Sequence, residues 1–276
     1  MQKKAIVVGA GIAGLACSLR LQKKGYEVTV VERNNYTGGK MHVLEGNGFR
    51  FDLGPSLFTM PGLVESLFEL SDKPIEDYFT YKKKEVICHY FWPDGSFFKA
   101  SAEPEEWIKE AADFFGEPSE ILRRYLNNSA RKYTLTAPIF LERSLADWKT
   151  YLSTNTLKAI FNLGALNIFN TLDKHHKGIF KNKKLIQYFN RFATYNGSSP
   201  YKTSAIMSMI PHLEMHKGTY FPTEGMHSIG QSLYQLAKDK GVRFLLETPV
   251  VKINVENNSA KGIEIVVNGA TQYLKA

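Results

Sequence analysis

Residues 5–32 read AIVVGAGIAGLACSLRLQKKGYEVTVVE, and the order of patterns within them indicates the architecture of the chain. The short apolar run at 5–8 is typical of a buried parallel strand. It leads into the glycine pattern G-x-G-x-x-G, after which apolar residues at helical spacing predict a helix that ends near Gly25. A second apolar strand, 28–31, follows. This order of strand, glycine turn, helix and strand predicts a nucleotide-binding α/β unit.

The three glycines of the turn have different physical roles. Gly9 permits the tight turn, Gly11 lets a pyrophosphate approach the backbone, and Gly14 lets the helix pack closely on the strand. Ile12 and Ala13 start the helix, whose unpaired N–H groups and positive dipole end attract phosphate. We therefore expect the residues of this turn to hold the phosphates of a nucleotide.

Glu32 stands at the tip of the second strand, at the distance from the glycines where a carboxylate can accept both hydroxyls of an adenosine ribose. A carboxylate at this place disfavours a 2′-phosphate, so NAD or FAD is favoured over NADP. The alternative is a glycine-rich turn that binds no nucleotide. The flanking strand, the helix and the acid together make that alternative the weaker interpretation.

The next stretch distinguishes between the two cofactors. Residues 33–40 read RNNYTGGK, and residues 51–55 read FDLGP after a hairpin predicted at 46–48. These motifs resemble the superfamily of flavin-containing amine oxidases and carotenoid desaturases. The resemblance implies that FAD is the cofactor. It places Arg33, Gly38, Gly39 and Lys40 near the FAD pyrophosphate. It places Gly54 and Pro55 near the flavin ring.

Two positions are worth comparing with the pattern of the superfamily. Lys40 replaces the commoner Arg and offers phosphate a point charge without a bidentate fork. Glu224 stands where the family usually has the first glycine of a diglycine, which argues against a close backbone approach to the flavin there.

The resemblance extends across essentially the whole chain. It is carried by FATYNGSSPY at 192–201, GTYFP at 218–222, GMHSI at 225–229 and LETPV at 246–250, all similar to carotenoid desaturases. It implies that the backbone of Val250 contacts the adenine. The sequence FDLGPSLFTMP at 51–61 resembles sequences of the bacterial branch that contains phytoene desaturases and 1-hydroxycarotenoid 3,4-desaturases.

The expected fold class is therefore α/β. A Rossmann-like FAD-binding domain with a β-meander is predicted from residues 1–80 and 215–276, and we expect it to be incomplete. Residues 81–214 are predicted to form an inserted, mainly helical substrate and membrane domain with a β-hairpin at 85–99. Related desaturases continue well past the last meander strand, so we expect the chain to be the N-terminal part of a longer protein.

The resemblance implies an oxidoreductase of carotenoid biosynthesis in which the flavin accepts a hydride from an apolar polyene, either phytoene or a 1-hydroxycarotenoid. The sequence identifies no catalytic acid or base. A flavin amine oxidase acting on a soluble amine shares the N-terminal motif and stays open as an alternative. A third possibility is a fragment that folds in part and does not retain FAD.

Composition and charge limit the partners. Gly 21, Pro 11 and Cys 2 among 276 residues exclude collagen-like and disulfide-rich chains, and the excess of 35 Lys and Arg over 27 Asp and Glu gives a net charge of +8. We interpret the two basic runs, 82–84 and 181–184, either as solvated surface or as contacts to anionic lipid. The charge-free stretch between Lys158 and Asp173 is interfacial or buried. No nucleic-acid-binding module is recognised, and the oligomeric state stays open.

These patterns, together with a substrate dissolved in the bilayer, predict a cytoplasmic protein peripherally associated with a membrane. Cys17 and Cys88 lack metal-ligand spacing and are interpreted as reduced structural thiols. The pair His175-His176 is expected to lie on a solvated basic helix face rather than to bind a metal.

Overall fold

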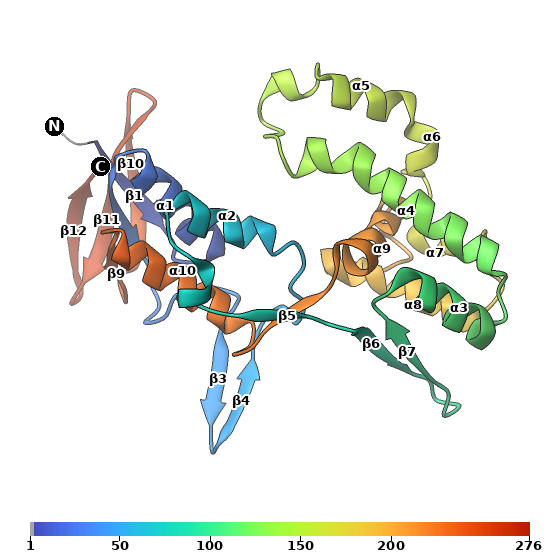
Figure 1. Ribbon diagram of the computed structural model, residues 1–276. Helices are drawn as coiled ribbons and strands as arrows, with labels where there is room; N and C mark the ends of the chain where they lie inside the picture. The colour runs from blue at the N-terminus through green and yellow to red at the C-terminus, as the bar shows by residue number, and fades with distance from the viewer. Residues whose placement is uncertain (1–2) are drawn as a thin grey trace. The chain divides into compact units, whose positions relative to one another are not determined.

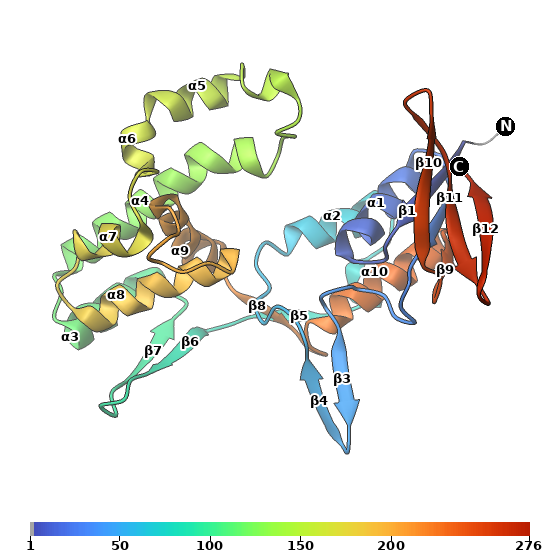
Figure 2. The same ribbon diagram turned by 180° about the vertical axis from the view of Figure 1, so that it is seen from behind.

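The computed structural model describes residues 3–276, and the chain divides into two compact units (Figures 1 and 2). The first unit contains the chain up to Lys83 together with Tyr220–Ala276. The second unit is the inserted segment Lys84–Thr219. Each unit has its own buried apolar cluster.

A three-stranded parallel sheet forms the centre of the first unit. Its strands are β1 (Lys4–Val8), β2 (Glu27–Val31) and β9 (Arg243–Leu245), in the order β1-β2-β9. Helices α1 (Ile12–Lys23) and α10 (His227–Asp239) lead into β2 and β9 and pack on each other. The sequence predicted β1, α1 and β2, whereas the three-residue strand β9 is too short to give a recognisable pattern.

The core of this unit explains why the apolar residues of the first motif are spaced as they are. Leu15 and Leu19 of α1, Val28 and Val30 of β2 and Leu233 of α10 are all at most 2% exposed. Burial of each such side chain contributes about 1.5–3 kcal/mol relative to leaving it in water. The motif is therefore held in place by a continuous core between sheet and helices.

The predicted meander is present as a second, antiparallel sheet made of β10 (Val250–Glu256), β11 (Ser259–Val267) and β12 (Ala270–Lys275). Asn257 and Asn258 both have positive φ (+49° and +58°), as the tight turn between β10 and β11 requires. The buried residues Ile263 and Ile265 of β11 pack with Val31 of β2. The meander thus lies close to the tip of β2.

Smaller elements complete the first unit. The hairpin predicted around 46–48 joins β3 (Val43–Gly46) to β4 (Phe49–Asp52). The remaining elements are α2 (Gly62–Leu70), a 3₁₀ helix (Ile75–Asp77), and the antiparallel pair β5 (Tyr81–Lys83) and β8 (Tyr220–Pro222).

The second unit is a mainly helical insertion that begins with a hairpin of β6 (Val86–Phe91) and β7 (Phe97–Ser101). Its core is aromatic, with Trp107, Tyr188 and Phe189 at most 1% exposed. The helices are α3 (Pro104–Phe115), α4 (Ser119–Phe140), α5 (Thr154–Phe161), α6 (Leu163–Leu166), α7 (Leu172–Lys177), α8 (Lys183–Asn190) and α9 (Ile210–His212), with 3₁₀ turns at Trp148–Thr150, Arg191–Asn196 and Ala205–Met209 and a π-helical turn at Leu213–Lys217. The predicted fold class is confirmed.

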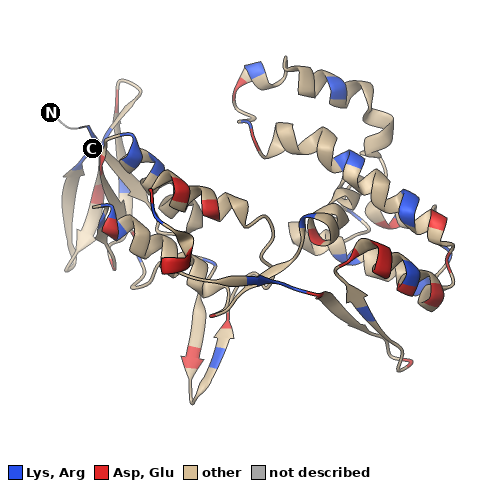
Figure 3. Cartoon of the chain, viewed as in Figure 1, with Lys and Arg blue, Asp and Glu red and all other residues tan. Residues whose placement is uncertain are grey.

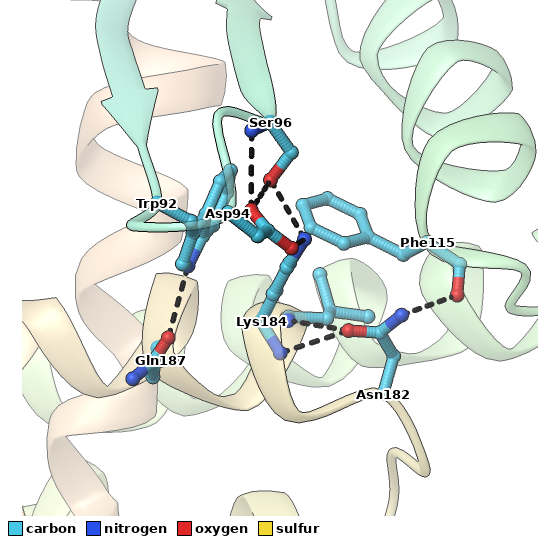
Figure 4. A network of polar contacts seen from close by, with 8 residues as sticks. Trp92, Asp94, Ser96, Phe115, Asn182, Lys184 and Gln187 are labelled. Atoms are coloured by element: carbon cyan, nitrogen blue, oxygen red, sulfur yellow. Dashed lines mark hydrogen bonds and ion pairs between the residues drawn. The ribbon is translucent and has the colours of Figure 1, made fainter.

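A network of polar contacts ties the β6–β7 turn to helix α8 (Figure 4). Lys184 pairs with Asp94 and donates to Ser96 Oγ over 2.7 Å, and Trp92 Nε1 donates to Gln187 Oε1 over 2.9 Å. Asn182 accepts from the first N–H groups of α8 and donates to the Phe115 carbonyl. In the basic run 181–184, Lys181 and Lys183 are exposed, whereas the side chains of Asn182 and Lys184 make contacts within the second unit.

The prediction for the histidine pair is wrong for one of its members. His176 is fully buried, because α7 turns it toward Tyr125 of α4 and Asn190 of α8. Asn190 Nδ2 donates to Asp173, so its Oδ1 accepts from His176 Nδ1–H, and His176 Nε2 accepts the Tyr125 hydroxyl proton. The pattern of partners therefore assigns His176 as the neutral Nδ1–H tautomer.

Candidate functional site

The predicted glycine turn lies between β1 and α1, and its geometry shows why glycine is needed at two of its positions. Gly9 has a φ of +98° and donates its N–H to Val31 O of the neighbouring strand over 2.7 Å. A Cβ on Gly14 would lie 2.0 Å from Gly9 O. The first turn of the helix therefore sits directly on the glycine turn, as the motif predicts.

Gly11 differs from Gly14 because the protein leaves space for an added Cβ, and from Gly9 because its φ is not positive. The nearest atom to an added Cβ would be Gly39 Cα at 3.9 Å, which is an ordinary van der Waals contact. Its backbone is extended (φ −71°, ψ 174°), a conformation open to any residue. Packing and backbone strain therefore do not demand glycine at this position, and close approach of a ligand is the remaining physical reason.

The N-terminus of α1 exposes hydrogen-bond donors. Gly11 precedes the helix, none of the described side chains caps it, and its first turn carries no acidic residue. Ile12 and Ala13 supply the first N–H groups, which have no acceptor one turn earlier in the helix. This end of α1 can therefore hold a phosphate through backbone N–H groups and the helix dipole.

The diglycine of the second motif lies against the first. Gly38 (φ +92°) donates its N–H to Ala10 O over 2.8 Å and forms a bridge with Gly11, and Gly39 has a φ of +60°. A Cβ on Gly39 would lie 3.1 Å from Gly11 Cα. Two segments that are distant in sequence thus meet backbone to backbone.

A fourth glycine, from a third segment of the chain, completes this contact, and sequence reasoning missed it. Gly230 of α10 would place a Cβ 2.8 Å from Gly38 Cα. The stretch GMHSI at 225–229, which contributed to the family resemblance, ends directly before Gly230. The glycine therefore lay next to a recognised motif. We call Gly11, Gly38, Gly39 and Gly230 the glycine cradle.

Glu32 is 8% exposed and braces the turn from within. One carboxylate oxygen accepts the Ala10 N–H over 2.8 Å, and the other accepts the Asn34 backbone N–H and side-chain amide, each over 2.9 Å. A carboxylate offers about four acceptor positions, so the geometry leaves it one for a further donor. Glu32 thus holds together the two segments that its predicted ligand would touch.

The remaining pyrophosphate and flavin candidates lie along the chain after β2. Arg33 and Lys40 are exposed, and the Lys40 side chain forms no ion pair with any residue between 3 and 276. A Cβ on Gly54 would lie 2.0 Å from Lys40 O, so Gly54 and Pro55, both exposed, run beside the cationic residue. The structure thus brings Lys40 and the FDLGP stretch together.

Val250 is the first residue of β10 and packs in the cluster that contains Val31. The Thr248 N–H, two residues earlier, donates to Glu32 O over 2.8 Å. The strand predicted to contact an adenine therefore starts beside the acid predicted to contact the ribose.

Asp52 links the FDLGP stretch to α10. Its carboxylate accepts the N–H groups of Met226 and His227 at the start of that helix, over 3.0 and 3.4 Å. Gly225 before them keeps a φ of +83°, while Glu224, where the family usually has glycine, is exposed. Burial, with the Arg50 cation nearby, lowers the pKa of His227. This side chain therefore stays neutral at neutral pH.

Two buried polar atoms near these segments lack a protein partner, which tests whether a cofactor fits. Thr37 Oγ1, directly before the diglycine, and His42 Nδ1, two residues after Lys40, are buried with no hydrogen-bond partner among the residues described. Buried polar groups are normally satisfied, so such orphans point to a polar ligand. Together with the open space at Gly11, they indicate that these residues fit FAD.

Comparison with known proteins agrees with this geometry. The model of the flavin containing amine oxidoreductase family matches residues 12–274. A 1-hydroxycarotenoid 3,4-desaturase from Flavobacterium sp. (strain P99-3) is 54% identical over 261 residues, which cover 95% of this chain and 53% of that protein. A 4,4'-diaponeurosporene oxygenase from Staphylococcus aureus (strain bovine RF122 / ET3-1) is 32% identical, covering 96% and 53%.

Among solved structures, cyclohexylamine oxidase from Brevibacterium oxydans IH-35A has a TM-score of 0.59 and 19% identity, covering 99% of this chain and 56% of that one. At this identity the likeness shows the fold alone. The chain spans about half the length of the curated relatives it matches. The resemblance predicted from the sequence is confirmed, and the chain belongs to the flavin containing amine oxidoreductase family.

Proposed function

We propose that this protein is an FAD-dependent carotenoid desaturase that introduces a C=C bond into an apolar polyene, with a 1-hydroxycarotenoid as the favoured substrate and phytoene as the other candidate. The observation that carries the proposal is the glycine cradle. It leaves room for a ligand at Gly11 in a chain that is 54% identical to a 1-hydroxycarotenoid 3,4-desaturase.

The residues proposed to hold FAD all belong to the first unit. Ile12 and Ala13 would bind the pyrophosphate through their N–H groups, Lys40 and Arg33 would neutralise its charge, and Glu32 would accept a ribose hydroxyl. The proposed adenine contact is the backbone of Val250, and the stretch at Gly54 and Pro55 would lie near the ring. The domains of the proposal are residues 1–80 and 215–276 for FAD and 81–214 for substrate and membrane.

The chemistry that FAD supplies when bound is acceptance of a hydride from the polyene. The substrate carbon next to the one that gives up the hydride loses a proton, and a C=C bond forms between them. The chain contributes binding, orientation and exclusion of water. None of its residues is assigned as an acid or base.

We propose that the second unit meets the membrane through residues 140–169, named here the apolar segment. Its large exposed side chains include Trp148, Phe161 and Phe169, which are 66%, 87% and 93% exposed. Figure 3 shows few charged residues on α5 and α6. A patch of this kind on a protein with a bilayer-dissolved substrate fits a lipid surface.

Within residues 3–276, no helix combines the length and the apolarity needed to cross a bilayer. The apolar segment would therefore lie in the interface rather than span it. The proposed location is the cytoplasmic face of a membrane.

Pigment conversion tests the activity. The protein, loaded with FAD, is incubated with a 1-hydroxycarotenoid in liposomes, and products are separated by chromatography and identified by mass. We expect a product lighter by two hydrogens whose absorption moves to longer wavelength, because its conjugated system is longer. Unchanged pigment in the presence of bound flavin would contradict the proposal, and peroxide release with amines would favour an amine oxidase instead.

Vesicle flotation tests the membrane contact. Phe161→Glu should weaken binding by about tenfold or more, because the interface loses a buried aromatic and gains a charge. Phe91→Glu, at an aromatic that is 74% exposed at the end of β6, is the matched control and should bind like the wild type. Equal binding of all three proteins would exclude the apolar segment as the contact.

A further inference from the structure

A cavity of about 200 Å³ lies within the second unit and is lined by none of the residues proposed to hold FAD. Its walls come from α4, α7, the 3₁₀ turn Ala205–Met209, and the chain in and after α6. Since one water takes about 30 Å³ in the liquid, there is room for a small polyatomic ligand. The lining includes Tyr125, Arg131, Lys132, Asn167, His175 and Ser208.

Lys132 is the unusual member of this lining, because it is only 2% exposed and no Asp or Glu among residues 3–276 pairs with it. Its ammonium donates to Ser208 Oγ over 2.7 Å and to Ala205 O over 3.4 Å, both uncharged acceptors. The Ser208 hydroxyl in turn donates to Ala205 O. A buried cation is costly unless an anion compensates it, and uncharged acceptors solvate the group without balancing its charge.

The rest of the lining adds positive charge and no negative charge. Arg131 has an uncharged partner, Asn162 Oδ1, over 2.6 Å, and no residue in the described lining is Asp or Glu. Asp173 on α7 already pairs with Lys177 and accepts from Asn190. Burial lowers the pKa of Lys132 to about 8, so most of this side chain is still charged at neutral pH. The cavity is therefore cationic, and none of the residues described in the structure supplies it with a counter-ion.

We propose that this cavity binds a phosphate group, held by the Lys132 ammonium and the Arg131 guanidinium. Arg matches two phosphate oxygens with its planar fork, and Lys adds a point charge. Asn167 of the lining can add a neutral amide donor, whereas the Tyr125 hydroxyl proton is already donated to His176. A tetrahedral oxyanion satisfies both cations and fits the available volume.

The phosphate could come from a soluble ester or from a lipid headgroup. Ala165 and Asn167 of the lining lie within the apolar segment, and Phe169, two residues further on, is 93% exposed. The cavity therefore borders the surface proposed to meet the membrane. The phosphate site does not require that surface to bind lipid, so the two proposals can fail separately.

The test follows the imidazole signals of His175, which lines the cavity, by NMR during titration with inorganic phosphate. The full chain is first saturated with FAD, so that inorganic phosphate cannot bind at the glycine cradle and contribute to the signal. We expect saturable shifts for the wild type. Lys132→Met should weaken phosphate binding about tenfold or more, because charge-assisted hydrogen bonds are lost.

Two further variants keep the result interpretable. Arg131→Met changes an exposed side chain and should weaken binding without disturbing the fold, which covers the case in which Lys132→Met folds poorly. Lys109→Met, on the exposed face of α3, removes the same charge elsewhere and should bind phosphate like the wild type. Equal shifts in all four proteins, or no shift at millimolar phosphate, would overturn the proposal.

A vesicle arm distinguishes the two sources. Binding to phosphatidylglycerol vesicles is compared with binding to vesicles of a phosphate-free galactolipid. If the site takes a lipid headgroup, Lys132→Met weakens binding to the phosphatidylglycerol vesicles but not to the galactolipid vesicles. Lys109→Met then weakens binding to neither kind of vesicle. If Lys132→Met changes phosphate binding but not vesicle binding, the site takes a soluble phosphate ester.

Discussion

The two units build their polar sites in opposite ways. In the first unit, backbone from three distant segments converges at the glycine cradle, where Gly38, Gly39 and Gly230 would each place a Cβ within 3.1 Å of another backbone atom. In the second unit, side chains from α4, α7 and α8 meet around His176, with Tyr125 and Asn190 as its partners. A site made of backbone requires glycine at fixed positions in the sequence. A site made of side chains requires the fold to bring together residues that are distant in sequence.

The largest expected effect tests whether the backbone site is part of the fold. Gly14→Ala should lower the free energy of unfolding by roughly 3–5 kcal/mol, because its Cβ would lie 2.0 Å from Gly9 O. Urea denaturation measures the change. Gly46→Ala is the control, since nothing lies within 4 Å of its added Cβ. If the two variants were equally stable, α1 would not pack on the glycine turn as described.

The second prediction concerns the side-chain site and its dependence on pH. Burial is the main cause that lowers the pKa of His176 from 6.5 to about 4. Between these values the unfolded chain binds the proton and the folded chain does not, so stability falls as the pH drops from 6.5 to 4. This residue should account for about 3 kcal/mol of that loss.

His176→Gln should remove this part of the pH dependence, because glutamine keeps hydrogen-bonding capacity and does not titrate. The measurement is urea denaturation of both proteins at several pH values. His89→Gln, on the β6–β7 hairpin, is the matched control and should keep the wild-type slope. Parallel curves for wild type and His176→Gln would mean that His176 is protonated in the fold.

A third, smaller effect concerns the brace between the cradle and β2. Glu32→Gln should cost about 2 kcal/mol, because an amide cannot accept at both of its ends from Ala10 and Asn34. Thermal or urea denaturation of the protein without FAD measures this cost. Glu27→Gln, at the exposed first residue of β2, should change stability little. An equal cost for both would contradict the bracing role.

The smallest effect is expected at the exposed network in Figure 4. The hydrogen bond from Lys184 is the main cause that holds the pKa of Asp94 well below its ordinary value. Lys184→Met should raise this pKa toward that of a free aspartate, as measured by NMR of the carboxyl carbon. Lys183→Met is the neighbouring control. An unchanged Asp94 titration in Lys184→Met would show that the pair does not form in solution.

The sequence predicted the first unit well because its requirements are local. Gly9 needs a positive φ and Gly14 needs a close contact within its own turn, and both appear as glycine at fixed spacing. The turn at Asn257 and Asn258 is similarly a property of two adjacent residues. Such positions can be recognised without knowledge of the rest of the fold.

Other features depended on partners that are distant in sequence. His176 looked solvated because its burial is set by Tyr125, 51 residues away, and Lys184 looked free because its partner Asp94 is 90 residues away. Gly230 was missed since its reason is contact with Gly38, not a local turn. Strand β9 has three residues and takes its state from pairing with β2.

The affinity of the Gly11→Ala variant for FAD shows whether a ligand approaches the backbone of the glycine turn. The protein has space for this methyl group, so the variant should keep the wild-type melting temperature. We expect its dissociation constant for FAD, measured by flavin fluorescence, to rise about a hundredfold, which corresponds to about 2.7 kcal/mol. Wild-type affinity in a stable Gly11→Ala protein would show that no ligand approaches the backbone at this turn, and would contradict the account.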